Sequence, residues 1–445
     1  MDFIVRFTQS HETFRIPEIE ALAIVEGVDL KVKEYRPESP YCIVTLPSED
    51  AAKRLVQRSI LVQAIYEHWA DSTTLSNLQD QIKRDEKYLR PRYQTCSFKF
   101  NFDSFQGTRQ HDAKVTIINS FAFLAFKGPI DLKNPDEEFA VLEEWQSKST
   151  VLGIAEPARL YFGRVVGVGA RDLATVYTLK KRGYISTTSM DSELALVTAN
   201  IALAAPGKLF YDPFVGTGSF PVACSHFGAL SFGSDIDGRA IRGQGNKKSV
   251  KGNFEQYGIK YLLGGMFVAD LTNTPIRISR DRRIFDGVVC DPPYGVREGL
   301  KVLGCRDPEK MPWSIEAGKE RSHLPDYIPP KKPYSFLAML DDILAFSAAT
   351  IVDNGRLAFW MPTANDEAEE IKVPSHPCLE VVAVSSQEFN KWSRKLIAYR
   401  RIPDSEVSQE ALEAYTNRQI QKGEGTTANE LNPFRRMYFT RFESQ

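Results

Sequence analysis

From residue 186 onward, short apolar runs alternate with helix-like segments, and this pattern restricts the fold more than any other feature of the sequence. The runs are KLFYD (208–212), ALSFGSD (229–235), GGMFVAD (264–270), DGVVCD (286–291), GRLAFWMP (355–362), LEVVAVSS (379–386) and KLIAYRRI (395–402). Strands that alternate with helices form parallel sheets. The sequence therefore predicts an α/β domain whose last two strands form an antiparallel hairpin at an edge of the sheet.

The first third of the chain has a different pattern, in which strand-like runs such as FIVRF (3–7) and YCIVTL (41–46) mix with amphipathic helices. One predicted helix ends at Gly27 and another is capped by Ser48. The segment 158–169 predicts a further strand that enters a linker. We expect α+β units over 1–65 and 66–160, a linker over 161–185, the α/β domain over 186–402, and a polar, partly helical and partly disordered tail over 403–445.

The overall charge and the cysteines limit the classes of function. The net charge is −1, so any binding of nucleic acid must come from local basic patches. The six cysteines include no CxxC pair, which argues against a zinc site or a disulfide framework and fits a reducing compartment. The sequence contains no run apolar enough for a membrane span and no signal-peptide core. We therefore expect a cytoplasmic protein without a membrane anchor.

The run DGVVC (286–290) is followed by an acid, two prolines and an aromatic residue, in the sequence DPPYG. Pro292 and Pro293 end the strand, because proline supplies no backbone N–H to a ladder. Asp291 is therefore left at the carboxyl end of the strand with Tyr294 nearby, and ligands bind at that end of open α/β sheets. Taken alone, these residues fit an ordinary strand-ending turn equally well.

A second candidate feature is DPFVGTGS (212–219), which follows the first strand of the α/β domain and precedes a helix. Gly216 and Gly218 have no Cβ, so a ligand can lie against their backbone, and the N–H groups of the helix start can bind an anion. The loop is not a dinucleotide fingerprint, because Pro221 occupies the third glycine position, and it is not a P-loop. A simple glycine-rich turn is the alternative interpretation.

Acids follow four successive predicted strands, at Asp212, Asp235, Asp270 and Asp291. A carboxylate after the second strand can accept hydrogen bonds from both hydroxyls of a ribose, and one after the third can accept an adenine amino group. A single such Asp is explained more simply as a helix N-cap, but four acids in one cleft favour a binding site. With the glycine loop they predict a site for S-adenosylmethionine (AdoMet) and a methyl transfer.

The DPPY segment suits an amino group on a nucleic-acid base. Such a nitrogen is a poor nucleophile, because its lone pair is delocalised into the ring. The Asp291 carboxylate and the Pro292 carbonyl can each accept one N–H and hold the nitrogen toward the methyl group, while Tyr294 stacks on the base. This catalysis consists mainly of positioning and charge placement, without a metal or a covalent nucleophile. A base inside a helix must be flipped out to reach the pocket.

DPFVGTGSF, GSDID and CDPPYG, in this order, resemble the AdoMet-dependent amino-methyltransferases of Rossmann-like fold. With RGYISTTSMDSELALVTANIA (182–202) before them and VREGLKVLG, FWMPTAND and EFNKWSRKL after them, nearly the whole chain resembles the catalytic subunits of the eukaryotic tRNA guanosine-10 N2-methyltransferase family. The resemblance implies a class I methyltransferase domain with a seven-stranded sheet, preceded by a ferredoxin-like domain (1–65) and a THUMP domain for tRNA (66–160). The implied product is N2-methylguanosine.

The resemblance also implies roles for individual residues and a partner. The target guanine would be held by Asp291, Pro292 and Tyr294, with no metal. The partner would be a small zinc-binding activator protein, forming a heterodimer, and we expect it to add to the sheet edge formed by the LSFGSD and GGMF strands. The residues implied around AdoMet are Thr187, Thr188, Ser189, Asp212, Phe214, Gly216, Gly218, Asp235 and Asp270.

Basic residues with tyrosines between them lie in the suspected THUMP segment, at Lys83, Arg84, Arg90 and Arg92. This combination predicts contacts with tRNA phosphates, and replacing Arg90 and Arg92 is expected to weaken tRNA binding and lower its salt dependence. Several alternatives stay open for the whole chain. They are methylation of an amino group on another RNA base, methylation of a protein glutamine, which Asp at position 291 disfavours, and a non-catalytic tRNA-binding module, which the intact DPPY and glycine loop disfavour.

Overall fold

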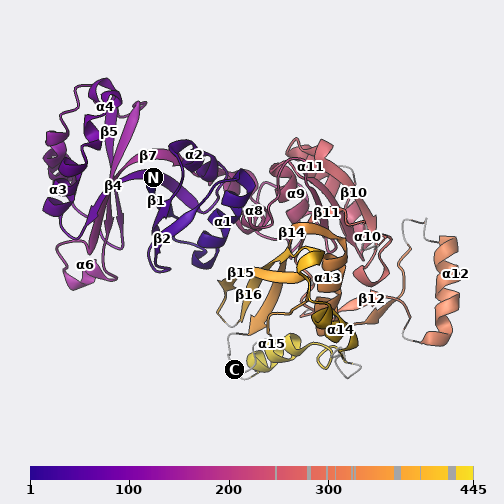
Figure 1. Cartoon of the computed structure of the whole chain (residues 1–445). Coiled ribbons are helices and arrows are strands. Elements are labelled where there is room, and N and C mark those ends of the chain that lie inside the picture. The colour runs from indigo at the N-terminus through magenta and orange to yellow at the C-terminus, as the bar shows by residue number, and fades with distance from the viewer. Residues whose placement is uncertain are drawn as a thin grey trace. The chain divides into compact units, whose positions relative to one another are not determined.

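The computed structural model describes residues 1–245, 248–277, 282–296, 299–305, 307–321, 324, 327–364, 372–390, 392–418 and 427–443. The chain divides into two compact units, Met1–Arg171 and Asp172–Gln445 (Figure 1). A seven-stranded sheet forms the centre of each unit. The division falls inside the predicted linker 161–185, and each unit is described here by itself.

The N-terminal unit contains one continuous sheet with the strand order β2-β3-β1-β4-β7-β6-β5. Neighbouring strands are antiparallel, except that β5 and β6 run parallel. Residues 161–168, inside the predicted linker, lie within β7 and therefore belong to this sheet. The strands are β1 (Asp2–Phe7), β2 (Lys31–Tyr35), β3 (Tyr41–Thr45), β4 (Val62–Ser72), β5 (Phe98–Phe105), β6 (Glu137–Glu144) and β7 (Arg159–Val168).

Local sequence signals fix the first two helices of this unit. The helix α1 (Arg15–Glu26) ends at Gly27, which has a φ of 61°, a left-handed conformation that glycine adopts readily. The helix α2 (Glu49–Gln57) begins where the Ser48 hydroxyl accepts the Ala51 N–H at 3.1 Å. Both predictions are confirmed. The remaining helices are α3 (Leu75–Asp85), α4 (Pro91–Thr95), α5 (His111–Asn119) and α6 (Ser149–Leu152).

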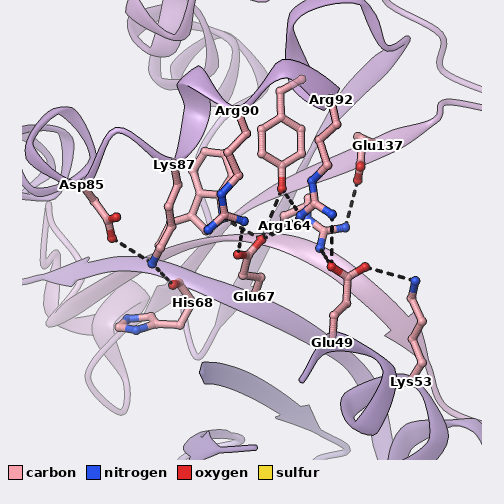
Figure 2. A network of polar contacts seen from close by, with 12 residues as sticks. Glu49, Lys53, Glu67, His68, Asp85, Lys87, Arg90, Arg92, Glu137 and Arg164 are labelled. Atoms are coloured by element: carbon pink, nitrogen blue, oxygen red, sulfur yellow. Dashed lines mark hydrogen bonds and ion pairs between the residues drawn. The ribbon is translucent and has the colours of Figure 1, made fainter. Parts of the chain in front are cut away.

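Glu67 on β4 is the centre of a buried network of ion pairs (Figure 2). Its side chain is 2% exposed and accepts hydrogen bonds from Arg164 Nε at 3.1 Å and Arg90 Nη1 at 2.8 Å. Arg164 also donates to Glu49 at 2.6 Å and to Glu137 at 3.0 Å. The network therefore connects α2 and the segment before α4 to three central strands.

Replacing Glu67 with Ala should destabilise the N-terminal unit strongly. The loss leaves buried Arg164 without its central carboxylate, and removing one partner of a buried ion pair typically costs about 3–5 kcal/mol. Hydrogen exchange of β4 and β7 peptides would report the loss. The control is Lys33→Ala, which removes an exposed pair with Asp2 at 2.6 Å and should cost less than about 1 kcal/mol. Equal protection in both variants would show that the Glu67 network does not stabilise the sheet.

The second unit contains the predicted α/β sheet, with the strand order β10-β9-β8-β11-β14-β16-β15. The first five strands run parallel, and β16 is antiparallel to both β14 and β15. The predicted fold class and the edge hairpin are therefore confirmed. The strands are β8 (Leu209–Asp212), β9 (Leu230–Asp235), β10 (Leu263–Val268), β11 (Phe285–Cys290), β14 (Ile351–Ala364), β15 (Leu379–Glu388) and β16 (Trp392–Arg401).

Alternate residues of β14 face different helices, as the period of two along a strand requires. Phe359 belongs to the core that includes residues of α13, whereas the Trp360 indole donates to Thr198 of α8 at 3.3 Å. Both aromatic side chains are fully buried, so they belong to the core of this domain. The helices are α7 (Asp172–Val176), α8 (Ser192–Ile201), α9 (Ser219–His226), α10 (Gly238–Arg242), α11 (Val250–Gln256), α12 (Met311–Arg321), α13 (Phe336–Thr350), α14 (Gln409–Asn417) and α15 (Pro433–Glu443).

Two segments of this unit contain structure that the sequence analysis did not predict. The long loop after β11 contains a small ribbon, β12 (Lys301–Leu303) with β13 (Lys331–Pro333). The segment 427–443 lies within the predicted polar tail, but Asn432 and Phe434 are buried against the domain. Three arginines in FRRMYFTRF conceal an apolar side of the helix, because only part of the surface of a helix packs against the domain.

Candidate active site at the carboxyl ends of the parallel strands

Four predicted acids lie at the same edge of the second sheet. Asp212 and Asp235 end β8 and β9, while Asp270 and Asp291 follow β10 and β11 within two residues. The strands β8 and β11 are neighbours, and the chain continues from them in opposite directions, to β9 and β10 on one side and to β14 on the other. Crevices at such switch points are the usual ligand sites of open α/β sheets.

The loop between β8 and α9 has an accessible backbone. Gly216 and Gly218 have φ values of 47° and 84°, which residues with a side chain rarely adopt. The Asp235 carboxylate fixes the loop by accepting the Gly216 N–H at 2.9 Å, and Asp212 accepts the Phe214 N–H at 2.9 Å. A Cβ placed on Gly216 would find its nearest neighbour 3.9 Å away, so a ligand can approach this backbone closely.

The predicted cofactor segment 187–189 borders the glycine loop. The Ser189 hydroxyl lies 2.7 Å from the Thr217 hydroxyl, and it also accepts the Ser186 N–H at 2.9 Å. Thr187 and Thr188 are exposed. The turn is therefore anchored to the loop by Ser189, while the two threonine side chains remain at the surface.

Asp270 already has several partners in its own chain. One carboxylate oxygen accepts the Asn273 N–H at 2.9 Å and the Thr272 hydroxyl at 2.6 Å. The other accepts the Leu303 N–H from β12 at 2.6 Å. These contacts are those of an N-cap that also holds the β12–β13 ribbon, so any further acceptor role of Asp270 has to share the carboxylate with them.

Burial and mutual repulsion make this edge of the sheet unfavourable for negative charge. Burial raises the pKa of Asp212 well above its usual range, and the nearby Asp235 and Asp291 raise it further. Burial also raises the pKa of Asp235, opposed by hydrogen bonds from the Asp237 and Gly216 N–H groups. A cationic ligand would relieve this repulsion, since opposite charges stabilise carboxylates in a low-dielectric site.

Asp291 and Tyr294 present buried polar atoms that the rest of the described chain does not satisfy. The Asp291 side chain is 20% exposed, but its Oδ1 is shielded from solvent, as is the Tyr294 hydroxyl. Neither atom forms a hydrogen bond within the described residues. Burial raises the pKa of Asp291 to about 6, opposed by the nearby Tyr294 hydroxyl and Arg394 guanidinium. Unsatisfied buried acceptors are rare, and this one is available to a donor on a ligand.

An aromatic cluster surrounds Tyr294, and most of it was not predicted from the sequence. The Tyr294 ring lies 6.0 Å from Trp392 and 6.5 Å from Phe434, both edge-on. Trp392 stacks on Phe389 at 4.5 Å. Trp392 therefore lies beside the DPPY segment. Phe434 could not be placed there from the sequence, because nothing local in the sequence puts α15 beside residue 294.

The start of α15 also holds the backbone of the DPPYG segment. The Asn432 side-chain amide donates to the Tyr294 carbonyl at 2.9 Å, and Arg435 donates to the Gly295 carbonyl at 2.7 Å and to the Val296 carbonyl. Asn432 is 2% exposed. The loop that carries the candidate catalytic residues is therefore fixed by side chains about 140 positions later in the sequence.

The predicted tRNA-binding residues have two different environments in the N-terminal unit. Lys83 and Arg84 are on the exposed side of α3, where Lys83 lies 3.4 Å from Asp80. Arg90 and Arg92 instead contact buried Glu67, and Arg92 also contacts Glu49 at 3.2 Å (Figure 2). The arginines therefore have a structural role that charge and spacing in the sequence did not indicate.

Two features are absent from the residues that the structure describes. No group of three or more His, Cys, Asp and Glu side chains in them could hold a metal ion. None of their helices is both long enough and apolar enough to span a membrane.

The contacts of Asn432 predict that its loss will loosen DPPYG. Asn432→Ala should increase hydrogen exchange in peptides covering 291–296 severalfold, because losing a buried hydrogen bond costs about 1–3 kcal/mol. Exchange of the β8 and β9 peptides should stay unchanged. Glu413→Ala, at an exposed position of α14, is the control. Unaltered exchange at 291–296 would show that α15 does not hold the loop.

Two family models match parts of the chain. Residues 1–171 match the model of the Tmrp11 THUMP N-terminal domain, and residues 180–302 match that of the RMKL-like methyltransferase domain. The second match spans both the glycine loop and DPPYG. Among solved structures, TrmN from Thermus thermophilus shares 15% identity with a TM-score of 0.42, over 90% of this chain and all of that chain.

Two curated relatives extend over most of the chain. The tRNA (guanine(10)-N(2))-methyltransferase of Saccharomyces cerevisiae is 43% identical over 89% of this chain and 92% of its own length. The human protein of the same name, TRMT11, is 32% identical over 90% of this chain and 88% of its own length. On this similarity, the chain belongs to the tRNA (guanine(10)-N(2))-methyltransferase family.

Proposed function

We propose that the protein transfers a methyl group from AdoMet to the exocyclic N2 amino group of guanosine 10 in tRNA and so forms N2-methylguanosine. The observation that carries this proposal is the unsatisfied acceptor Asp291 Oδ1 beside Tyr294, at the switch point of the sheet. Family membership supports tRNA as the substrate, and the THUMP match over 1–171 supports an RNA-binding N-terminal unit.

The residues at the ends of β8 and β9 fit AdoMet. The backbone at Gly216 has room for a ligand, and the start of α9 offers N–H groups to a carboxylate. The raised pKa values of Asp212 and Asp235, caused first by burial, favour a ligand with positive charge, and AdoMet carries a sulfonium and an ammonium group. When bound, AdoMet supplies the electrophilic methyl group. Thr187, Thr188, Ser189, Phe214, Gly218 and Asp270 complete the proposed binding residues.

The catalytic contribution of the chain is to hold the amino group. The Asp291 carboxylate and the Pro292 carbonyl accept the two N–H groups, and Tyr294 contacts the flipped base. Pro292 and Pro293 keep this segment out of the ladder, and Asn432 fixes it from the other side. Holding a nucleophile in reacting geometry lowers a barrier by several kcal/mol. Asp291 is ionised above a pH of about 6. The carboxylate can then accept the hydrogen bond and stabilise the positive charge that develops on the amino group.

The tRNA itself would be bound mainly by the N-terminal unit. Lys83 and Arg84 remain candidates for phosphate contacts, because their side chains are exposed or half-exposed on α3. Arg90 and Arg92 stay in the proposal only through the exposed part of each side chain, 39% and 41% respectively. Their ion pairs with Glu67 orient these cations rather than remove them from the surface.

The test is nucleoside analysis of unmodified tRNA incubated with labelled AdoMet and the protein, with and without the activator. We expect N2-methylguanosine from tRNA with G10 and none from tRNA with A10, since adenine has no N2 amino group. Asp291→Ala should lower the rate at least about 100-fold, as removal of a key charge-stabilising group does. Calorimetry should show that it still binds AdoMet, and Glu413→Ala should behave as wild type.

Other outcomes identify the alternatives. Methylation of A10 tRNA at the same rate would indicate another base as the target. Methyl transfer by Asp291→Ala at the full rate would contradict the role of the carboxylate. A protein that binds tRNA without transferring methyl, even with the activator, would be a non-catalytic binding module.

We also propose that the small zinc-binding activator adds to the sheet at β10. This strand forms one edge of the sheet, and exposed strand edges require covering. Val268, the last residue of β10, is 47% exposed, and Tyr261, two residues before the strand, is 78% exposed. These side chains give the edge an apolar character that suits a protein partner.

Val268→Lys should weaken the complex with the activator roughly tenfold or more, which corresponds to about 1.4 kcal/mol, because a lysine on an edge strand opposes strand addition. Co-purification and titration of the two proteins would measure this change. Val382→Lys makes the same substitution on β15, at the opposite edge of the sheet, and should have no effect. If only Val382→Lys weakens the complex, the partner binds the other edge.

A further inference from the structure

Arg394 on β16 is a cation beside the candidate catalytic carboxylate. Its Nη1 lies 3.9 Å from Asp291 Oδ2, and its side chain is only 14% exposed. The sequence gives no indication of this contact, because 103 positions separate the two residues along the chain. The pairing of β16 with β14, and of β14 with β11, brings the arginine to the carboxyl end of β11.

Neighbouring side chains hold the guanidinium of Arg394 in place. Its Nε donates to Gln387 Oε1 on β15 at 2.7 Å. The guanidinium carbon lies 4.7 Å from the centre of the Trp360 ring and 5.7 Å from that of Phe389. A cation fixed over aromatic faces cannot move away freely, so its distance from Asp291 is determined by the hairpin.

The charges that face Asp291 differ in sign and in origin. Asp212 at the end of β8 is negative when ionised and repels it. Cys290 and Tyr294, on either side of Asp291 in the chain, have pKa values raised well above their usual ranges by burial, so both are neutral. Arg394 is the cation that opposes the effect of burial on Asp291. Arginine suits this place, because its guanidinium keeps its charge when partly buried.

We infer that Arg394 is a positioning residue that holds Asp291 in its carboxylate form and turns Oδ2 toward itself, so that Oδ1 remains available to the amino group of the substrate. This inference rests on the proposed function, and it adds a charge requirement that neither the DPPY segment nor the family match contains. The division of the two oxygens agrees with the contacts, since Oδ2 faces Arg394 while Oδ1 has no hydrogen-bond partner among the described residues.

The test is the pH dependence of kcat/KM for tRNA methylation by the full chain with its activator, confirmed by single-turnover rates. The wild-type rate should fall as the pH drops through about 6, where Asp291 takes up a proton. An opposite charge within about 4–6 Å lowers the pKa of a carboxyl by about 1–3 units. Arg394→Gln should therefore move the acid side of the profile upward by about one unit, so that the loss of rate at pH 6.5 exceeds that at pH 8.5 about threefold.

Two variants separate charge from packing. Arg394→Lys keeps the cation and should restore the wild-type position of the acid side. Arg400→Gln is the matched control on the same strand, where Arg400 pairs with Glu380 at 2.7 Å, and its profile should match the wild type. If Arg394→Gln does not fold, Gln387→Ala frees the guanidinium without removing it and should move the profile in the same direction by a smaller amount.

A rate that falls equally at every pH in Arg394→Gln would overturn the inference, because Arg394 would then act through packing alone. An acid side that does not move in Arg394→Gln would also overturn it, as would a Lys variant that behaves like the Gln variant. These results differ from failure of the proposed function, in which the wild type does not methylate guanosine 10 or Asp291→Ala retains full activity.

Discussion

The proposed mechanism requires the carboxylate of Asp291 to be charged although it is partly buried, and much of the second unit bears on this requirement. Burial alone favours the protonated acid, and an ionised Asp212 at the end of β8 would add to that preference. A parallel sheet creates the difficulty, since it brings the ends of β8, β9 and β11 together. The same sheet also supplies a compensating positive charge, because β16 runs antiparallel to β14 and places Arg394 at the same edge.

The DPPYG segment is fixed by parts of the chain that come much later. Two prolines restrict its backbone, but they supply no hydrogen bonds that would position it. Asn432 and Arg435 provide these bonds to three successive carbonyls, and Phe434 packs against the ring of Tyr294. A loop held in this way would lose little freedom when the base of the proposed substrate enters, and such preorganisation is what a site that works by positioning needs.

Local patterns predicted the parts of the site that depend on local physics. A strand ended by prolines, a loop that needs glycine and an acid after each strand are all visible within ten residues, and the structure places them where the sequence indicated. Arg394 and Asn432 were not predictable in this way, because their roles depend on strand pairing and on the path of the C-terminal segment. Asp270 is an intermediate case, since the N-cap that its sequence context equally allowed is present in the structure.

The basic residues of the N-terminal unit show that charge and spacing in a sequence do not by themselves identify a binding surface. Arg90 and Arg92 have the spacing and tyrosine neighbours of a nucleic-acid surface, but their partner is Glu67, on a strand that ends nearly twenty residues earlier. A buried carboxylate needs several cations around it, so part of the positive charge in this segment is required by the fold itself. Only the charge left over after such internal pairing is available to phosphate. The same reasoning applies to the site in the second unit, where Arg394 pairs with Asp291. Any contact between Arg394 and RNA would have to be compatible with that pairing.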